Sequence, residues 1–248
     1  MIDRRRFIAA GTSGLLLGGC DRLNNSSAFR ETLRSAEKLT MASQRLISPR
    51  DTLAREFSEA DLSPIFRSNG TRLPGGDDYA RHVSEQFANW RLAVEGLVDR
   101  PLSIPLSTLR SLPHRVQITR HDCVEGWSAI GKWHGVQLSR ILDHARLSTR
   151  ARYIVFHCAD RFGDKPFYES IDLVDAFHPQ TIIAWGMNGN FLPVPNGAPL
   201  RLRVERQLGY KQAKYIQRIE AVDSLARVWG GKGGYWEDNA DYEWYAGI

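Results

Sequence analysis

The residues best suited to chemistry stand in one short segment of the chain. It reads Arg120-His121-Asp122-Cys123-Val124-Glu125-Gly126-Trp127-Ser128, which sets one cysteine among ionisable side chains. A cysteine thiolate is a soft ligand that favours redox-active metals over magnesium or calcium. Cys123 is therefore a candidate metal ligand, although this segment alone also allows a reactive thiol or half of a disulfide.

Cysteine is scarce in the chain, which narrows these alternatives. The three cysteines are Cys20, Cys123 and Cys158. If Cys20 serves as a lipid anchor, Cys123 and Cys158 could pair in an oxidising compartment, as in a cofactor-free lipoprotein that acts as a binding module. The sequence has neither a Cys-x-x-Cys-His haem motif nor an iron-sulfur cysteine cluster, so a redox centre would be of another kind.

Other ionisable side chains near Cys123 are candidates for a catalytic role. Glu125 stands two positions after Cys123, on the same side of an extended segment. A carboxylate there would repel an anionic ligand and tolerate a neutral one, although it could equally hold a neighbouring amide or arginine. His121 and His134 could transfer protons or could be structural histidines with satisfied hydrogen bonds.

The N-terminus has the pattern of an export signal. Arg4-Arg5 with Phe7 resembles a twin-arginine signal, and an apolar run of glycine and small residues follows up to Leu17-Gly18-Gly19-Cys20. The run is shorter than the roughly 20 apolar residues of a transmembrane helix. Because the last four residues resemble a lipoprotein box, we expect residues 1–20 to be removed and Cys20 to carry a lipid. The alternative is an ordinary signal peptide with a chance cysteine.

The charge balance gives no indication of nucleic-acid binding. The full chain has 33 Lys and Arg against 28 Asp and Glu, a net charge of +5. Without residues 1–20, which hold three arginines and one aspartate, 30 basic residues face 27 acidic ones, a net charge of +3. A nucleic-acid surface would need a concentrated basic stripe. The remaining 228 residues are enough for one sizeable core or two small ones.

Helical spacing and turn signals organise the first third of the chain. Residues 21–61 are expected to form a polar tether and a helical segment, with a second helix starting at Ser48-Pro49. The stretch Ser68 to Gly76 contains Asn-Gly and Pro-Gly pairs and predicts a loop, which could be functional. Residues 62–248 are expected to form the main domain.

Alternation of apolar and polar residues predicts strands after this loop. Such a pattern runs through residues 90–95, 116–119 and 200–204, and residues 153–158 form a compact apolar strand. Helical spacing predicts a short helix around residues 106–109 and a longer one over residues 138–145. The strand at residues 200–204 has an apolar side and a cationic side with Arg201 and Arg203. The fold class is therefore α+β, with strand-rich mixed sheets and flanking helices.

Four motifs, taken together, resemble the sulfite oxidase family of molybdopterin oxidoreductases. They cover about residues 62–248 in family order and spacing, and are most similar to the small exported branch that includes the catalytic subunit of periplasmic methionine sulfoxide reductase. The motifs are Cys123-Val124-Glu125-Gly126-Trp127-Ser128, Met187-Asn188-Gly189, Asn196-Gly197-Ala198-Pro199-Leu200-Arg201-Leu202 and Leu208-Gly209-Tyr210-Lys211-Gln212-Ala213-Lys214-Tyr215-Ile216.

This resemblance implies a cofactor and a set of residues that hold it. Cys123 would ligate the molybdenum of a Mo-molybdopterin, with the other sulfurs supplied by the pterin. Arginine and lysine suit a buried phosphate, whereas without the resemblance Arg201 and Lys214 would be expected on a solvated face. The positions that match the family's cofactor contacts are Asn69, Asn196, Arg201, Gln212, Ala213 and Lys214, together with Cys158, at a position where the small branch can carry threonine.

The resemblance also implies a reaction and partners. We expect two-electron oxygen-atom transfer on a small substrate, with Glu125 slightly favouring reduction of a sulfoxide-like compound; the alternative is a sulfite dehydrogenase. A membrane or c-type cytochrome would be the electron partner, because the sequence has no haem segment. The chain lacks the family's C-terminal dimerisation domain, so we expect a monomer on the periplasmic side of the membrane.

Overall fold

The computed structural model describes residues 26–248, in two units that meet between Pro49 and Arg50. The described part of the first unit is a single helix, α2 (Ser27–Ile47), capped by Ser26. The predicted second helix start is wrong: Ser48 has an extended backbone and ends α2, because the residue before a proline disfavours helical geometry. The expected export signal and Cys20 lie outside the described residues.

None of the helices in the described part of the chain is long and apolar enough to cross a bilayer. The second unit runs from Arg50, before the expected boundary at residue 62, to Ile248. Its residues 50–61 contact the main sheets, since Glu56 forms a bridge with Thr119 and Phe57 N donates to Ile118 O at 2.9 Å.

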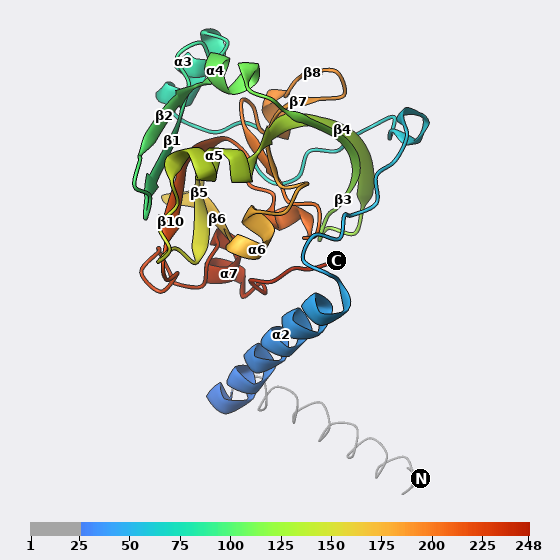
Figure 1. Cartoon of the computed structure of the whole chain (residues 1–248), viewed down its shortest axis with the longest axis vertical. Helices are drawn as coiled ribbons and strands as arrows, with labels where there is room; N and C mark the ends of the chain where they lie inside the picture. The colour runs from blue at the N-terminus through green and yellow to red at the C-terminus, as the bar shows by residue number, and fades with distance from the viewer. Residues whose placement is uncertain (1–25) are drawn as a thin grey trace, which may run out of the picture. The chain divides into compact units, whose positions relative to one another are not determined.

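Two five-stranded sheets build this second unit and lie on opposite sides of it (Figure 1). In the first sheet the order is β2-β1-β10-β5-β6, with β1 parallel to β10 and the other pairs antiparallel. Its strands are β2 (Leu102–Pro105), β1 (Arg91–Gly96), β10 (Ile216–Val222), β5 (Tyr153–Phe162) and β6 (Lys165–Asp172). The second sheet has the order β3-β4-β7-β8, and β9 pairs with β7. Its strands are β3 (Arg115–Asp122), β4 (Ser128–Gln137), β7 (Ile182–Met187), β8 (Asn190–Phe191) and β9 (Arg201–Arg203).

Short helices cover the sheets and connect them. They are α3 (Asp77–Ser84), α4 (Leu106–Ser111), α5 (Leu138–Ala145), α6 (Leu173–Ala176) and α7 (Tyr235–Ala240), with single turns η1 (Glu59–Asp61), η2 (Val194–Asn196) and η3 (Gly209–Lys211). The apolar face of α5 joins the main core with buried residues of β1, β5 and β10. The expected α+β class, with strand-rich mixed sheets and flanking helices, is confirmed.

In the second sheet, polar side chains are buried and an apolar one is exposed, which is the reverse of the usual pattern in an amphipathic strand. On β3 the polar Gln117 and Thr119 are buried, whereas Val116 is 43% exposed. The cationic side of β9 is also buried, so the alternative of a solvated face does not hold for Arg201, nor for Lys214. Buried polar groups are tolerated when hydrogen bonds replace water, and here the polar faces of β3 and β9 supply partners to each other.

A buried ion cluster fastens the C-terminal segment to the second unit. Lys211 of η3 forms ion pairs with Glu169 of β6 and Glu237 of α7, and all three side chains are buried. Ser170 donates to the Gly233 carbonyl in the loop that leads to α7. These buried charges hold the C-terminal segment in the fold.

Candidate active site

Cys123 lies at the tip of the hairpin that joins β3 to β4. Its amide donates to Trp127 O at 2.9 Å, and Gly126 N donates to Cys123 O at 3.0 Å. This tight turn needs a positive φ of 84° at Gly126, which glycine adopts without strain. The hairpin places Cys123 with only 7% of its surface exposed, and burial raises the pKa of its thiol.

A pocket of about 140 Å³ lies beside this turn and collects segments that are far apart in the sequence. The loop Asn69–Thr71, the hairpin residues Cys123 to Glu125 and the end of β5 form part of its wall. The rest of the wall includes Gly209, Tyr210, Gln212 and Lys214, and the C-terminal residues Trp236 and Tyr242. Five predicted site residues therefore meet around one pocket: Asn69, Cys123, Glu125, Gln212 and Lys214.

Lys214 ties the predicted functional loop to the site. Its Nζ donates to the carbonyls of Asn69 at 2.6 Å and Pro195 at 3.0 Å, and also to that of Thr71. The pKa of Lys214 is lowered to about 7, mainly because the side chain is buried and to a lesser extent because Arg201 is positively charged. The ammonium group thus clamps the loop that carries Asn69.

Four other predicted site residues lie behind the pocket wall. Arg201 is fully buried on β9, and its Nη1 donates to Asn196 O at 3.1 Å. The pKa of Arg201 is lowered to about 9, mainly because the side chain is buried and to a lesser extent because of the charge of neighbouring Arg203. Ala213 and Cys158 are both buried and both belong to the main apolar core. Cys123 and Cys158 are both free thiols, so the disulfide alternative is not what the structure contains.

Several buried polar atoms around the pocket have no hydrogen-bond partner among residues 26–248. They are Nε and Nη2 of Arg201, Nδ2 of Asn196, Nε2 of His121, and the oxygens Oδ1 of Asn69, Oδ1 of Asp160 and Oε1 of Gln212. Such atoms are rare, because an unsatisfied buried group costs about 1–3 kcal/mol. Their concentration here indicates a site built for a ligand with both donors and acceptors.

A pterin with a phosphate group fits this set. The free guanidinium nitrogens of Arg201 suit an anionic phosphate, and the free oxygens of Asn69, Asp160 and Gln212 suit the ring N–H groups. Burial raises the pKa of Asp160 to about 6. The described residues contain no group of three His, Cys, Asp or Glu side chains able to hold a metal on their own.

Glu125 is exposed on the pocket wall next to Cys123. Its Oε2 accepts a hydrogen bond from Trp127 Nε1 at 2.9 Å. The carboxylate thus holds a neighbouring N–H group while Glu125 lines the pocket, and its selection of a substrate stays a prediction.

His121 and His134 occupy different environments. His134 lies away from the pocket, with its ring 5.9 Å from that of Trp185 and 6.2 Å from that of His114. His121 is fully buried next to the hairpin, where burial and the cations Arg201 and Arg203 hold its pKa well below the usual value. His121 is therefore a neutral imidazole at the edge of the site.

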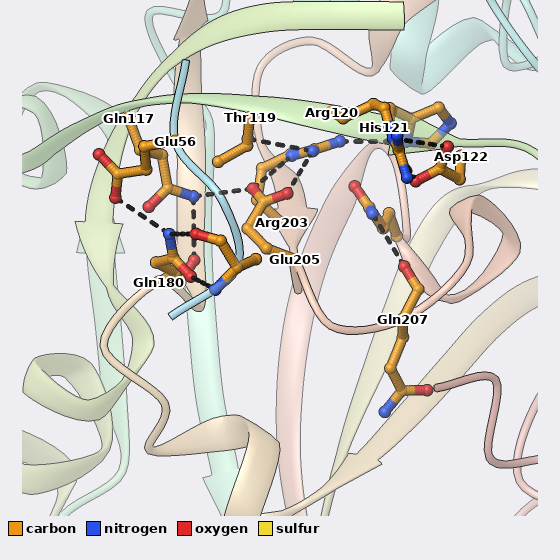
Figure 2. Close-up of polar contacts among 12 residues, drawn as sticks. Glu56, Gln117, Thr119, Arg120, His121, Asp122, Gln180, Arg203, Glu205 and Gln207 are labelled. Atoms are coloured by element: carbon orange, nitrogen blue, oxygen red, sulfur yellow. Dashed lines mark hydrogen bonds and ion pairs between the residues drawn. The ribbon is translucent and has the colours of Figure 1, made fainter. Parts of the chain in front are cut away.

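Sequence reasoning missed the buried group that surrounds His121. Arg203 forms an ion pair with Glu205 and donates to His121, and Gln117 donates to Glu205 (Figure 2). The one sequence signal was the charge alternation of Arg201, Arg203 and Glu205 along one strand and its continuation. Asp160 was missed as well, since nothing in its local sequence distinguishes it from a surface aspartate.

Comparisons with known proteins agree with this geometry. Residues 80–228 match the family model described as oxidoreductase molybdopterin binding domain. The chain is 37% identical, over 98% of its length and 87% of the relative's, to a candidate protein-methionine-sulfoxide reductase subunit, YedZ1, of Azospira oryzae. It is 29% identical to the protein-methionine-sulfoxide reductase catalytic subunit of Campylobacter jejuni, over 64% of this chain and 57% of that protein.

A solved structure shares the fold. The sulfane dehydrogenase SoxCD from Paracoccus pantotrophus superposes with a TM-score of 0.51, at 21% identity, over 55% of this chain and 39% of that chain. The family match covers more than half of the chain and spans the hairpin of Cys123, both sheets and the run that ends in Lys214. This chain is an enzyme that belongs to the family of oxidoreductases with a molybdopterin-binding domain.

Proposed function

We propose that this enzyme reduces a small neutral sulfoxide by two-electron oxygen-atom transfer, with Mo-molybdopterin as cofactor and Cys123 as the protein ligand to molybdenum. The observation that carries the choice of substrate is the carboxylate of Glu125 on the pocket wall beside Cys123. The cofactor would supply the two-electron redox chemistry. The chain's own residues bind the cofactor, shape the pocket and select the substrate.

The buried donors and acceptors that have no hydrogen-bond partner support specific roles for the cofactor-binding residues. Arg201 and Asn196 would bind the phosphate, because their free N–H groups are buried and rigidly placed. Asn69 and Gln212 offer oxygens to the pterin ring. Lys214 would act mainly through the loop that it clamps, since its ammonium group already donates to three carbonyls.

The negative charge of Glu125 discriminates between anionic and neutral substrates. Two like charges about 5 Å apart repel by roughly 3 kcal/mol at an effective dielectric constant near 20, and solvent reduces this at an exposed position. Sulfite is an anion and meets that repulsion, whereas a sulfoxide is neutral. The hydrogen bond from Trp127 holds the carboxylate in place, so it cannot simply swing away from an incoming anion.

The names of the two relatives, both of which refer to protein-methionine-sulfoxide reductase, support the same choice. A sulfite dehydrogenase is the competing proposal within the same family. Export through the N-terminal signal, a lipid anchor at Cys20, a monomeric state and electron delivery by a membrane or c-type cytochrome complete the proposal; they rest on the sequence patterns and on the family.

Metal analysis of the purified protein tests the cofactor assignment. We expect about one molybdenum per chain in protein from a host that makes molybdopterin, and loss of the metal in Cys123→Ser. Cys158→Ser, at the second buried thiol, tests separately whether that predicted cofactor contact affects the metal content. Absence of molybdenum from the parent protein, or equal metal content in Cys123→Ser, would overturn the proposal.

Steady-state assays with an artificial electron carrier test the direction and the substrate. We expect turnover of methionine sulfoxide or a related sulfoxide with a reduced carrier, and little turnover of sulfite with an oxidised one. Efficient sulfite oxidation without sulfoxide reduction would establish the competing function on the same cofactor.

A further inference from the structure

Three ionisable side chains meet beneath the C-terminal segment, and their charges do not balance. Nζ of Lys211 donates to Oε1 of Glu169 and, at 2.7 Å, to Oε1 of Glu237. All three side chains are shielded from solvent, with at most 1% of their surface exposed. If both carboxylates were ionised, the single ammonium group would leave one uncompensated negative charge inside the protein, which is unfavourable away from water.

The two carboxylates also lie close to each other. A Cβ atom at Gly234 would collide both with Oε2 of Glu237 and with Oε1 of Glu169, so oxygens from both carboxylates lie against the same point of the backbone. Oε2 of each glutamate has no hydrogen-bond partner among residues 26–248. Two carboxylates that are this close and buried tend to hold one proton between them, because like charges disfavour the second ionisation.

The other ionisable groups that face Glu169 in the described part of the chain add no positive charge. Tyr168 stands next to it on β6, and Cys158 lies on the neighbouring strand β5; burial raises the pKa of both, so both are neutral. Asp238 on α7 accepts a hydrogen bond from Tyr168 and brings a further carboxylate near the cluster. Lys211 therefore faces an excess of acidic groups.

The direction of the pH dependence follows from this environment. Burial, and next the charge of Glu237, raise the pKa of Glu169 well above its usual value of 4.5. The folded state therefore holds a proton that the unfolded state releases. The stabilisation from this proton is complete below pH 4.5 and is lost as the pH rises through the raised pKa.

The segment that this cluster fastens borders the pocket. Trp236 of α7 and Tyr242, which follows α7, both line the pocket, and their rings stack with centroids 5.8 Å apart. Trp244 donates to Ser170 Oγ at 2.9 Å and adds a neutral hydrogen bond. The ion pairs of Glu237 are made from α7 itself, so a change in their charge acts directly on this wall.

We propose that Glu169 and Glu237 share one proton, and that loss of this proton at alkaline pH releases residues 233–242 from the pocket wall. The cluster of Lys211, Glu169 and Glu237 is then a pH-sensitive latch. It is closed while one ammonium group faces one negative charge, and it weakens when the second negative charge appears. The inference does not rest on the proposed cofactor or substrate.

Infrared spectroscopy of the purified protein detects the shared proton directly, because a protonated carboxyl group has a carbonyl stretch distinct from that of a carboxylate. Near neutral pH we expect a protonated-acid band that disappears at alkaline pH. The band should be missing from both Glu169→Gln and Glu237→Gln, since each variant leaves one carboxylate opposite Lys211. If no such band is lost in both variants, the two glutamates do not share a proton and the proposal fails.

Hydrogen exchange followed by mass spectrometry measures the release of residues 233–242. Above the pKa of the pair, an opening linked to one proton becomes about tenfold more frequent per pH unit. Intrinsic exchange also accelerates with pH, but equally in all variants, so the ratio of the parent's exchange rate to that of Glu237→Gln isolates the latch. We expect this ratio to rise by about tenfold or more between about pH 6 and pH 9; a constant ratio overturns the proposal.

Two further variants complete the test. Asp241→Asn is the matched control, because Asp241 stands at the end of α7 and pairs with Lys232 at an exposed position. It should keep the pH dependence of the parent, and its loss there would mean that surface charge sets the release. Glu169→Gln should reproduce Glu237→Gln from the side of β6, and either variant suffices if the other does not fold. A parent-like pH dependence in Glu169→Gln would exclude Glu169 from the latch.

Discussion

Nζ of Lys211 lies 2.7 Å from Oε1 of Glu237, and both side chains are buried. Lys211 also pairs with Glu169 on β6. Because α7 carries Trp236, which lines the pocket, this ion pair holds one wall of the active site in place. Lys211 therefore contributes both to the stability of the fold and to the shape of the pocket.

Replacing this lysine should destabilise the protein strongly. Lys211→Met leaves two buried carboxylates without their cation, and the loss of one partner of a buried ion pair costs about 3–5 kcal/mol. Urea denaturation followed by fluorescence measures the loss of unfolding free energy. Lys232→Met is the control, because Lys232 pairs with Asp241 at an exposed position and should cost less than about 1 kcal/mol. Similar losses in both variants would contradict the role of Lys211.

Asp160 should make the stability of the cofactor-free protein fall between about pH 4 and pH 6. Burial raises its pKa from 3.8 to about 6, so the folded state holds a proton that the unfolded state releases. The stabilisation is full below pH 3.8 and is lost as the pH rises through 6. A shift of about two units corresponds to roughly 3 kcal/mol.

The variant Asp160→Asn checks this pH dependence, because the amide cannot ionise. Its unfolding free energy, measured by urea denaturation from pH 3.5 to pH 7, should lack the fall seen in the parent protein. A parent stability that rises with pH relative to Asp160→Asn would mean that the Asp160 carboxylate is stabilised in the fold, contrary to its burial.

Short sequence motifs were enough to predict the site residues that stand close together in the sequence. Cys123 and Glu125 stand two apart in one motif, and Gln212 and Lys214 belong to another, so family spacing was enough to place them around one pocket. The strands and α5 followed from their apolar periodicity.

The partners of His121 were beyond such reasoning. Arg203 is 82 residues away in sequence, and its burial contradicts the rule that a charged strand face is solvated. Gln117 and Thr119 are also buried although a polar strand face is expected to be solvated. Their burial depends on the ion pair of Arg203 and Glu205 in another part of the chain. Burial of a polar face becomes predictable only once the pairing of β3, β4, β7 and β9 is known.

Neutralising Glu125 should weaken the discrimination against sulfite. Glu125→Gln removes the negative charge but keeps an oxygen that can accept from Trp127 Nε1, as Oε2 does now. We expect sulfite to bind about tenfold more tightly, equivalent to about 1.4 kcal/mol of relieved repulsion after solvent screening. The inhibition constant of sulfite against sulfoxide reduction measures this effect. The KM for a neutral sulfoxide should change little, and an equal change for both compounds would mean that Glu125 acts through pocket shape.

Arg201 and Arg203 are neighbours on β9 that should respond oppositely to the same substitution. Arg201 is buried with two unpartnered nitrogens, so Arg201→Met should raise the unfolding free energy of the cofactor-free protein by about 1 kcal/mol or more. Arg203→Met leaves Glu205 buried without its cation and should lower it by about 3–5 kcal/mol.

Molybdopterin content completes the comparison. It should fall at least about tenfold in Arg201→Met, although that variant is the more stable one, because the charge that destabilises the empty pocket is the charge that would bind the phosphate. Binding residues commonly trade stability for function in this way. If Arg201→Met were destabilising and still retained the cofactor, Arg201 would be a structural residue and the phosphate site would lie elsewhere.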